Sequence, residues 1–463
     1  MKILLFGTGE YYQKYKKWFD KENIVALLDN DKDKQGNYID DIIVMSPNKI
    51  EDVEYDIVVI LSFFVKEMKE QLLSKGVREE QIYHFYDIKK LIEEGYLKEK
   101  SFPIMEYDVE SEEKKNSKNI LLLSQDLERI GPNSALLKLS SILKGLNYNL
   151  TLGVMCDGPM RQDFLNAGVK IVVDNNLQVA YMNEINWIMK YKTVLCNTLN
   201  FHIFLMHRNT DARIIWWLHD PLYFYEGARK ENFCKINREG LEIYTVGIIP
   251  ENAIKQYMPD IDCNRLLYFV EDCQLRSVPK DDEIVFTIIG YINNIKGQDV
   301  LIDAINKTSP DIIDKCKFIF VGNDQTAAAK HIKQKCNGKS KLIFTGVVDK
   351  DTVQQELDKT DVLVCPSRLD AMPTVCVEAM VKEIPCVVSD ITGIAEYIID
   401  YDNGIRFKSE NVEDLSQKIK WCVENKNRLK TMGEKSRIIY DENFAESVFR
   451  QNIDRIFNDR LGD

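Results

Sequence analysis

The sequence predicts an α/β protein built on parallel sheets, because short apolar runs alternate with helical patterns along most of the chain. Lys2–Phe6 is such a run, followed by a glycine turn and a helix, and Val362–Cys365 is followed by a loop and an apolar helix. A run that is apolar throughout is typical of a strand buried on both faces, as parallel strands are. The 463 residues correspond to about three domains at ~150 residues each.

Composition narrows the classes of function. The formal net charge of −12 argues against a nucleic-acid-binding protein, which usually needs a basic face to neutralise phosphates. The 11 cysteines are scattered singly, which is typical of reduced thiols in a cytosolic protein. The N-terminus runs directly into a strand, and no apolar run approaches ~18 residues, so neither a leader peptide nor a spanning helix is expected. We expect a soluble cytoplasmic protein, at most peripheral at the inner face of a membrane.

Residues 1–96 are expected to form a small Rossmann-like domain. The turn Gly7-Thr8-Gly9 follows the first strand, and Asp29 follows the second strand about 20 residues on, where an acid contacts a ribose hydroxyl in dinucleotide-binding folds. Tyr12 stands where the third glycine of that fingerprint would be. The pattern leaves two interpretations open: a nucleotide site at Gly7, Gly9 and Asp29, or a scaffold domain with an empty crevice.

The helix after this turn carries lysines between aromatic residues, in the string YYQKYKKWFDK. Such a helix can lie in a membrane interface. We favour the other interpretation, an amphipathic helix that packs on its own sheet and keeps Lys14, Lys16 and Lys17 in solvent.

Residues 97–118 are rich in charge and lack periodicity, so they are expected to be a linker. A second α/β domain is expected over 119–280. It begins with the strand Ile120–Ser124 and a loop that contains Gly131. Its strand Ile214–Leu218 ends in His219, at the carboxyl end of a parallel strand, where ligands bind in open α/β sheets.

A third domain is expected over 281–440, followed by a C-terminal helix within 441–463. Its first strand leads into a loop with Gly290, Tyr291 and Lys296, and a later strand ends at Gly346. A cation in such a loop can neutralise a phosphate.

The stretch Asp361–Phe407 carries two acids, Asp370 and Glu378, at the loop and helix that follow a buried strand. Between them, Ala371–Thr374 places backbone N–H groups at or near a helix N-terminus, where the helix dipole favours an anion. Amides for a phosphate and carboxylates for hydroxyls are the groups that a nucleotide-sugar requires.

These motifs resemble those of retaining GT-B glycosyltransferases of family 4. The string PSRLDAMPTVCVEAM is similar to the family's donor signature of two acids eight residues apart, with Asp370 in place of the first Glu. IGYINNIKGQDVLIDAI is similar to its G-R-x…K-G loop, with Tyr291 in place of Arg. The resemblance covers 119–463. Residues 1–96 resemble the small Rossmann-like domain that precedes some sugar-modifying enzymes and is associated with nucleotide-sugars.

The resemblance implies a GT-B fold, two Rossmann-like domains facing a cleft, with the additional N-terminal domain. It implies a glycosyltransferase that moves a sugar, with retention, from a nucleotide-sugar (a UDP-sugar) to a glycan, lipid-linked or protein acceptor. The terminal helix would cross back to the acceptor domain. No metal or other cofactor is expected. The implied catalytic residues are His219, Lys296, Asp370 and Glu378, and the implied donor-binding residues are Gly131, Gly290, Tyr291, Gly346, Ala371, Met372, Pro373 and Thr374.

Two alternatives belong to other classes. The first is a GT-B-shaped binding or scaffold subunit of a glycosyltransferase complex, weakened by Tyr291 and Asp370. The second is an oxidoreductase or epimerase with a nicotinamide site in the first domain, against which Tyr12 counts. The wealth of Lys, Ile and Asn suggests a bacterial source and cell-surface glycan synthesis. The oligomeric state stays open.

Overall fold

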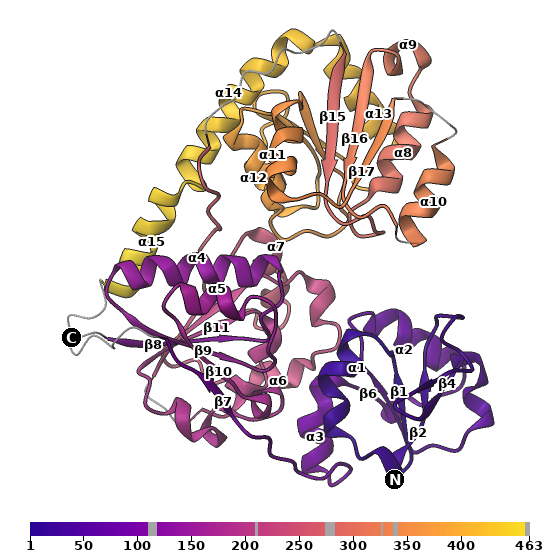
Figure 1. Cartoon of the computed structure of the whole chain (residues 1–463), viewed down its shortest axis with the longest axis vertical. Coiled ribbons are helices and arrows are strands. Elements are labelled where there is room, and N and C mark those ends of the chain that lie inside the picture. Colours follow the sequence, from indigo (N-terminus) through magenta and orange to yellow (C-terminus); the bar gives the residue numbers. More distant parts are fainter. Residues whose placement is uncertain (110–117, 209–211, 274–282, 326, 337–340, 459–463) are drawn as a thin grey trace. The chain divides into compact units, whose positions relative to one another are not determined.

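The computed structural model describes residues 1–109, 118–208, 212–273, 283–325, 327–336 and 341–458. The chain divides into two compact units. Unit 1 is Met1–Ile243 with Ala253–Asp262, and unit 2 is Tyr244–Asn252 with Cys263–Asp463. The structure contains three sheets, and helices connect the strands of each sheet (Figure 1).

The first sheet has six strands in the order β3-β4-β2-β1-β5-β6 and belongs to unit 1. All of its pairs are parallel except β3–β4. Because β1 lies between β2 and β5, the strand order reverses beside β1, and ligands of open α/β sheets bind at such a switch point. The elements are β1 Ile3–Phe6, α1 Glu10–Tyr15, β2 Ile24–Leu28, β3 Tyr38–Ile39, β4 Ile42–Met45, β5 Ile57–Ile60, α2 Val65–Ser74, β6 Ile82–His84 and α3 Ile88–Glu93.

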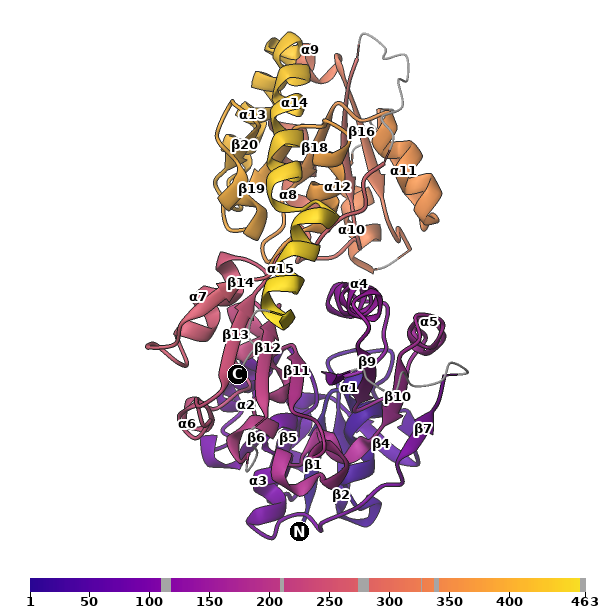
Figure 2. The same ribbon diagram turned by 90° about the vertical axis from the view of Figure 1, so that its left-hand side faces the viewer.

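The second sheet has eight strands in the order β14-β13-β12-β11-β8-β9-β10-β7, and Figure 2 displays them from β14 to β7. Strand β7 is antiparallel to β10 and forms an edge; it lies within the range predicted to be a linker. Helix α4 begins at Gly131 with a proline in its first turn, as helices favour, and buries a leucine face. The elements are β7 Met105–Tyr107, β8 Asn119–Ser124, α4 Gly131–Gly145, β9 Asn149–Val154, α5 Arg161–Asn166, β10 Lys170–Val173, β11 Thr193–Asn197, β12 Arg213–Leu218, α6 Lys230–Cys234, β13 Leu241–Thr245, α7 Ile248–Lys255 and β14 Cys263–Arg265.

The third sheet lies in unit 2, with six strands in the order β17-β16-β15-β18-β19-β20, all paired in parallel. Helices α8, α10 and α13 cover one face, and α11 and α12 lie on the other (Figure 1). The elements are β15 Ile284–Ile289, α8 Gln298–Lys307, α9 Pro310–Ile313, β16 Cys316–Val321, α10 Ala327–Lys335, β17 Leu342–Gly346, α11 Lys350–Asp358, β18 Val362–Cys365, α12 Thr374–Val381, β19 Cys386–Ser389, β20 Gly404–Phe407, α13 Val412–Glu424, α14 Lys426–Asn443 and α15 Glu446–Asn458.

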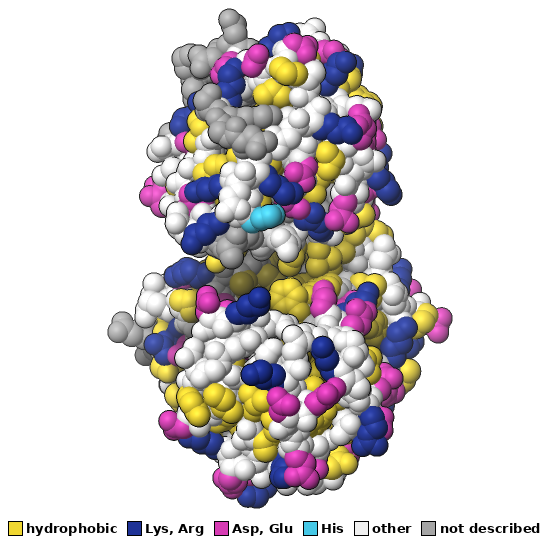
Figure 3. All heavy atoms as spheres, turned by 90° about the vertical axis from the view of Figure 1, so that its right-hand side faces the viewer, with side chains coloured by type: hydrophobic (Ala, Val, Ile, Leu, Met, Phe, Trp, Pro, Cys, Tyr) yellow, Lys and Arg dark blue, Asp and Glu magenta, His cyan; other side chains and the backbone are white. Residues whose placement is uncertain are grey.

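Parts of the predicted domain boundaries lie outside the described residues. These are 110–117 of the predicted linker, the junction at 280 and 281, and 459–463 of the predicted terminal helix. Within the part of the chain that the structure describes, no helix is both long and apolar enough to span a bilayer. On the face seen in Figure 3, basic and acidic side chains are interspersed without a broad area of one sign.

Candidate active site

The third sheet brings together two of the predicted site residues. Lys296 lies in the loop after β15 and Asp370 in the loop after β18, and these strands are neighbours in the sheet. Since parallel neighbours end at the same edge, their loops meet there. The Lys296 Nζ donates to the Asp370 Oδ2 at 2.6 Å, with side chains 33% and 13% exposed. The predicted cation and the first predicted acid thus form one ion pair.

Glycines allow the loops after β15, β18 and β19 to approach one another closely. Gly297 has φ +72°, and a Cβ there would lie 2.1 Å from the carbonyl oxygen of Pro366. A Cβ on Gly393 would lie 1.7 Å from the carbonyl oxygen of Ala371, and the Gly393 N–H donates to the Asp370 carbonyl at 2.9 Å. No other residue fits either position without moving the backbone.

Arg368 is a residue that the sequence analysis missed. Its guanidinium makes a two-point ion pair with Asp299 at the start of α8, at 2.9 and 2.7 Å, and its Nε donates to Glu410 at 2.7 Å. Its backbone N–H donates to the Ile295 carbonyl at 2.8 Å. Arg368 therefore fastens the Asp370 loop to the Lys296 loop. In the sequence, Arg368 is distinguished only by its position two residues before Asp370, and an arginine at this position belongs to no motif.

Glu378 lies half-buried on α12, four residues after Thr374, so the two residues share one face of that helix. Thr374 is exposed at the first position of the helix, while Met372 and Pro373 are buried before it. Because the first N–H groups of a helix have no intrahelical acceptor, this end can receive an anion.

The charged form of Lys296 is stabilised by the Asp370 carboxylate. Burial lowers its pKa, but the neighbouring Asp370 carboxylate more than offsets this, so the pKa of Lys296 is raised and the ammonium stays charged at neutral pH. Within the described part of the chain, Lys296 is the only hydrogen-bond donor to the Asp370 carboxylate. One of its oxygens therefore keeps acceptor capacity for a hydroxyl.

The remaining predicted donor residues of unit 2 lie in the loops after β15 and β17. Gly290 has φ +145° and packs beside the Lys296 side chain. Tyr291 has 60% of its surface exposed, so its phenol lies in solvent. The family that this loop resembles has an arginine at this position. Gly346 ends β17 with φ +72°, near Asp324.

His219 and Gly131 belong to unit 1, on the second sheet. The buried His219 Nε2 lies 2.7 Å from the Asn197 Oδ1. Burial lowers the pKa of His219 to about 3, so the imidazole is neutral at physiological pH and can position a group by hydrogen bonding without carrying charge. Gly131 is the first residue of α4, with open space at its Cβ position.

The first sheet has a cavity of about 550 Å³ at the carboxyl ends of β1, β2 and β5. This cavity is separate from the Lys296–Asp370 pair, which belongs to the third sheet. Gly7, Gly9 and Asp29 all line the cavity. Asp29 Oδ2 accepts the Thr8 N–H at 3.0 Å. Burial raises the pKa of Asp29, but hydrogen bonds from Thr8 and Asp31 and the charge of Lys34 together outweigh burial and lower it. The three residues predicted as a second nucleotide site are thus brought together.

No cluster of three or more His, Cys, Asp or Glu side chains suited to a metal ion occurs among the residues that the structure describes. One protein-family model matches most of unit 2. Residues 273–438 match the model described as "Glycosyl transferases group 1". These residues are thus similar to the glycosyltransferases of group 1. Lys296, Asp370, Glu378 and Gly393 all lie within the matched range. Residues 1–83 match a second model, described as "C2185-like, N-terminal".

Two curated relatives align with about a third of the chain. An uncharacterised glycosyltransferase of Methanocaldococcus jannaschii is 32% identical over 142 residues, 31% of this chain and 39% of the relative. The N,N'-diacetylbacillosaminyl-diphospho-undecaprenol alpha-1,3-N-acetylgalactosaminyltransferase of Campylobacter jejuni is 26% identical over 147 residues, 31% of this chain and 38% of the relative. The chain thus spans about two fifths of the length of these relatives.

Among solved structures, Anabaena HepE in complex with UDP and glucose is similar, with a TM-score of 0.60, 18% sequence identity, and 73% of this chain and 99% of that chain covered. The likeness shows a GT-B glycosyltransferase fold over 73% of the chain, and the first sheet adds an N-terminal α/β domain. The fold class predicted from the sequence is confirmed.

Proposed function

We propose that this protein is a glycosyltransferase that moves a sugar from a UDP-sugar, with retention, to a glycan, lipid-linked or protein acceptor in bacterial cell-surface glycan synthesis. The observation that carries the proposal is the Lys296–Asp370 pair at 2.6 Å at the carboxyl ends of β15 and β18, within the range that matches the group 1 model. The HepE structure contains UDP and glucose, and the name of the Campylobacter relative specifies a diphospho-undecaprenol-linked sugar, which supports this donor and a lipid-linked acceptor.

In this mechanism Lys296 and the N–H groups near Ala371 and Thr374 stabilise the negative charge that develops on the departing diphosphate, which is the main electrostatic task of the transfer. Glu378 takes the ribose hydroxyls. The unused acceptor capacity of Asp370 receives a sugar hydroxyl while its other oxygen aims Lys296. The neutral His219 positions sugar or acceptor. Chemistry at this site needs no metal ion in our proposal.

The test uses a panel of UDP-, GDP- and CDP-sugars with the full chain. Lys296→Ala and Glu378→Ala are each expected to lower transfer by about 100-fold or more, because each removes a contact to the donor. Lys341→Ala is the matched control, since Lys341 has the same side-chain exposure as Lys296 and pairs with Glu283 in the same unit, away from the site loops. Thermal melting checks that all variants fold.

Wild-type rates in both site variants would show that the site is elsewhere. Tight donor binding by the wild type without any transfer would favour the scaffold subunit, the alternative function.

The cavity of the first sheet favours a second candidate, a further nucleotide-sugar site at Gly7, Gly9 and Asp29. Gly9 has φ −85°, which other residues adopt, and no atom lies within 4 Å of its Cβ position. Gly9→Tyr should therefore fill the cavity without straining the backbone. We expect calorimetry with nucleotide-sugars to lose one binding step in this variant, while Asn48→Tyr, at an exposed position of the same domain, keeps it. Equal binding by all three proteins would contradict the second site, and binding of NAD(P) instead would favour the oxidoreductase alternative.

A further inference from the structure

Lys14, on helix α1 of the first sheet, reaches a carboxylate of the second sheet. Its Nζ donates to the Asp126 Oδ2 at 2.8 Å, and the two side chains are only 12% and 4% exposed. Lys14 thus lies in a contact between domains, whereas the sequence pattern predicted a lysine in solvent. Its neighbour Lys16 fits that prediction better, since it pairs with Asp40 near the surface. Lys14 also pairs with the exposed Glu10, so it is the removal of Lys14 that leaves a buried charge, on Asp126, uncompensated.

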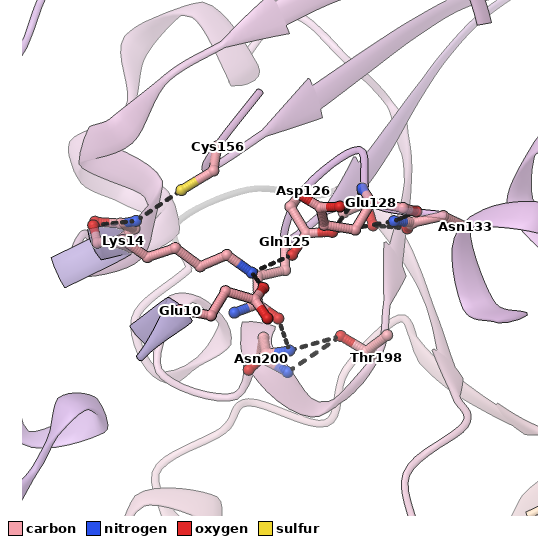
Figure 4. A network of polar contacts seen from close by, with 11 residues as sticks. Glu10, Lys14, Gln125, Asp126, Glu128, Asn133, Cys156, Thr198 and Asn200 are labelled. Carbon is pink, nitrogen blue, oxygen red and sulfur yellow. Dashed lines mark hydrogen bonds and ion pairs between the residues drawn. The ribbon is translucent and has the colours of Figure 1, made fainter. Parts of the chain in front are cut away.

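Asp126 shapes the loop that leads into α4. Its Oδ1 accepts the Glu128 N–H at 3.0 Å and the Asn133 Nδ2 at 3.1 Å (Figure 4). Asn133 in turn donates to the Glu128 carbonyl at 2.9 Å and accepts from Ser124 at 2.7 Å. These bonds tie the two ends of the segment 125–133 together, with Gly131 inside it. Lys14 supplies the positive charge for the carboxylate at the centre of this arrangement.

A second contact between the two domains holds the residues that follow β11, the strand that pairs with β8. The Tyr86 hydroxyl of the first domain donates to the Asn200 Oδ1 at 2.7 Å, and the Asn200 Nδ2 donates to the Gln125 Oε1 at 2.8 Å. Thr198, just before Asn200, has φ +78°, which is unfavourable for a β-branched residue. Such a conformation persists only where its surroundings hold it.

Both contacts lie where the carboxyl ends of the second sheet's strands meet. Segment 125–133 follows β8, and Thr198 and Asn200 follow β11, which pairs with β8 in parallel. Ligands of open α/β sheets bind outside the carboxyl ends of the strands. His219 belongs to the same edge, through its contact with Asn197 at the end of β11.

We propose that Lys14 is a positioning residue for glycosyl transfer: through Asp126, and with Tyr86 on Asn200, the N-terminal domain holds the 125–133 loop in the shape that a hydroxyl-bearing acceptor requires. The proposal rests on the proposed function, and it gives the N-terminal domain a role that does not depend on a ligand in its own cavity. Lys14 acts only through the loop and contacts neither substrate.

The experiment compares Lys14→Met with wild type in the full chain, using amide hydrogen exchange and steady-state kinetics with donor and acceptor varied separately. We expect protection of residues 125–133 to fall and the KM for acceptor to rise by about ten-fold, while the KM for donor rises by about three-fold at most, because all of the predicted donor-binding residues except Gly131 lie in or after the strands of the third sheet. Lys14→Arg should restore part of the effect. Lys21→Met is the control, since Lys21 forms an exposed pair with Asp41 in the same domain.

If Lys14→Met does not fold, Tyr86→Phe gives the same test, since it removes one hydroxyl and should raise the KM for acceptor by a smaller factor. An unchanged KM for acceptor in a folded variant, with or without loss of loop protection, overturns the proposal. An equal rise in both KM values also overturns it, because it indicates a general loss of structure. Failure of the proposed function is distinguishable, since the wild type would then show no transfer at all.

Discussion

Two Lys–Asp pairs of similar geometry occur in the two units, and their surroundings differ. Lys296 and Asp370 in unit 2 are joined at 2.6 Å, and Lys14 and Asp126 in unit 1 at 2.8 Å. In both, burial lowers the pKa of the lysine, and the carboxylate more than offsets this and raises it. Asp126 accepts two further hydrogen bonds from its own loop. In the described residues, the Asp370 carboxylate accepts only from Lys296.

This difference separates a structural pair from a candidate binding pair. A carboxylate whose oxygens are filled by the chain fixes a loop and has little left for a ligand. A carboxylate with one oxygen still available can accept a substrate hydroxyl. The number of protein donors around the acid, more than the length of the ion pair, distinguishes the two sites.

The largest expected effect comes from the same substitution at the two acids. Asp370→Asn should lower transfer by about 100-fold or more, because Lys296 loses the charge that aims it, while the melting temperature changes little at this partly exposed pair. Asp126→Asn should leave Lys14 with only the exposed Glu10 carboxylate as a counter-charge and cost about 1–3 kcal/mol of stability. Transfer assays and urea unfolding, followed for each unit, measure both quantities.

The comparison fails if the two variants give the same pattern. A stability loss at Asp370→Asn as large as that at Asp126→Asn would make both pairs structural. A stable Asp126→Asn would show that Glu10 alone compensates the charge of Lys14.

The sequence alone predicted the candidate site of unit 2 in large part. Lys296 and Asp370 follow two apolar runs that form neighbouring parallel strands, and such strands end at one edge, so the meeting of these two residues follows from the strand pattern. Arg368 was missed because its partners Asp299 and Glu410 lie 69 and 42 residues away and no periodicity links them.

The contact between Lys14 and Asp126 could not be predicted for a related reason. The two residues are 112 positions apart, and their meeting depends on how two domains pack. The positive φ of Thr198 likewise depends on tertiary contacts, since a threonine by itself predicts an extended backbone. The strand β7 was hidden in a charged segment because an edge strand needs little apolar sequence.

The smallest and most selective expected effect is a dependence on pH confined to unit 1. Burial lowers the pKa of His84 and His202 to about 4 and that of His219 to about 3, all in unit 1. An unfolded chain protonates these histidines below about pH 6.5, whereas the folded chain does not, so their contribution to stability is present above pH 6.5 and is lost as the pH falls toward 4.

Asp220 acts in the opposite sense, since burial raises its pKa to about 6 and favours the folded state as the pH falls through the same range. Three histidines outweigh one acid, so we expect unit 1 to lose several kcal/mol between pH 6.5 and 4, and most of this window lies above the pKa of ordinary carboxylates. Unit 2 contains a single histidine, His331, which is exposed on α10.

Tryptophan fluorescence can follow unit 1 in this window, because four of the 5 tryptophans lie there: Trp18, Trp187, Trp216 and Trp217. His202 is fully buried and stacks on Phe233, with ring centroids 5.2 Å apart. His202→Asn should therefore flatten the fall in stability with pH by about a third, since one of three proton-excluding groups is gone. His331→Gln is the matched control and should leave the slope unchanged. A slope that is the same in His202→Asn as in the wild type would mean that this histidine is protonated in the folded unit, and that its burial does not distinguish unit 1 from unit 2.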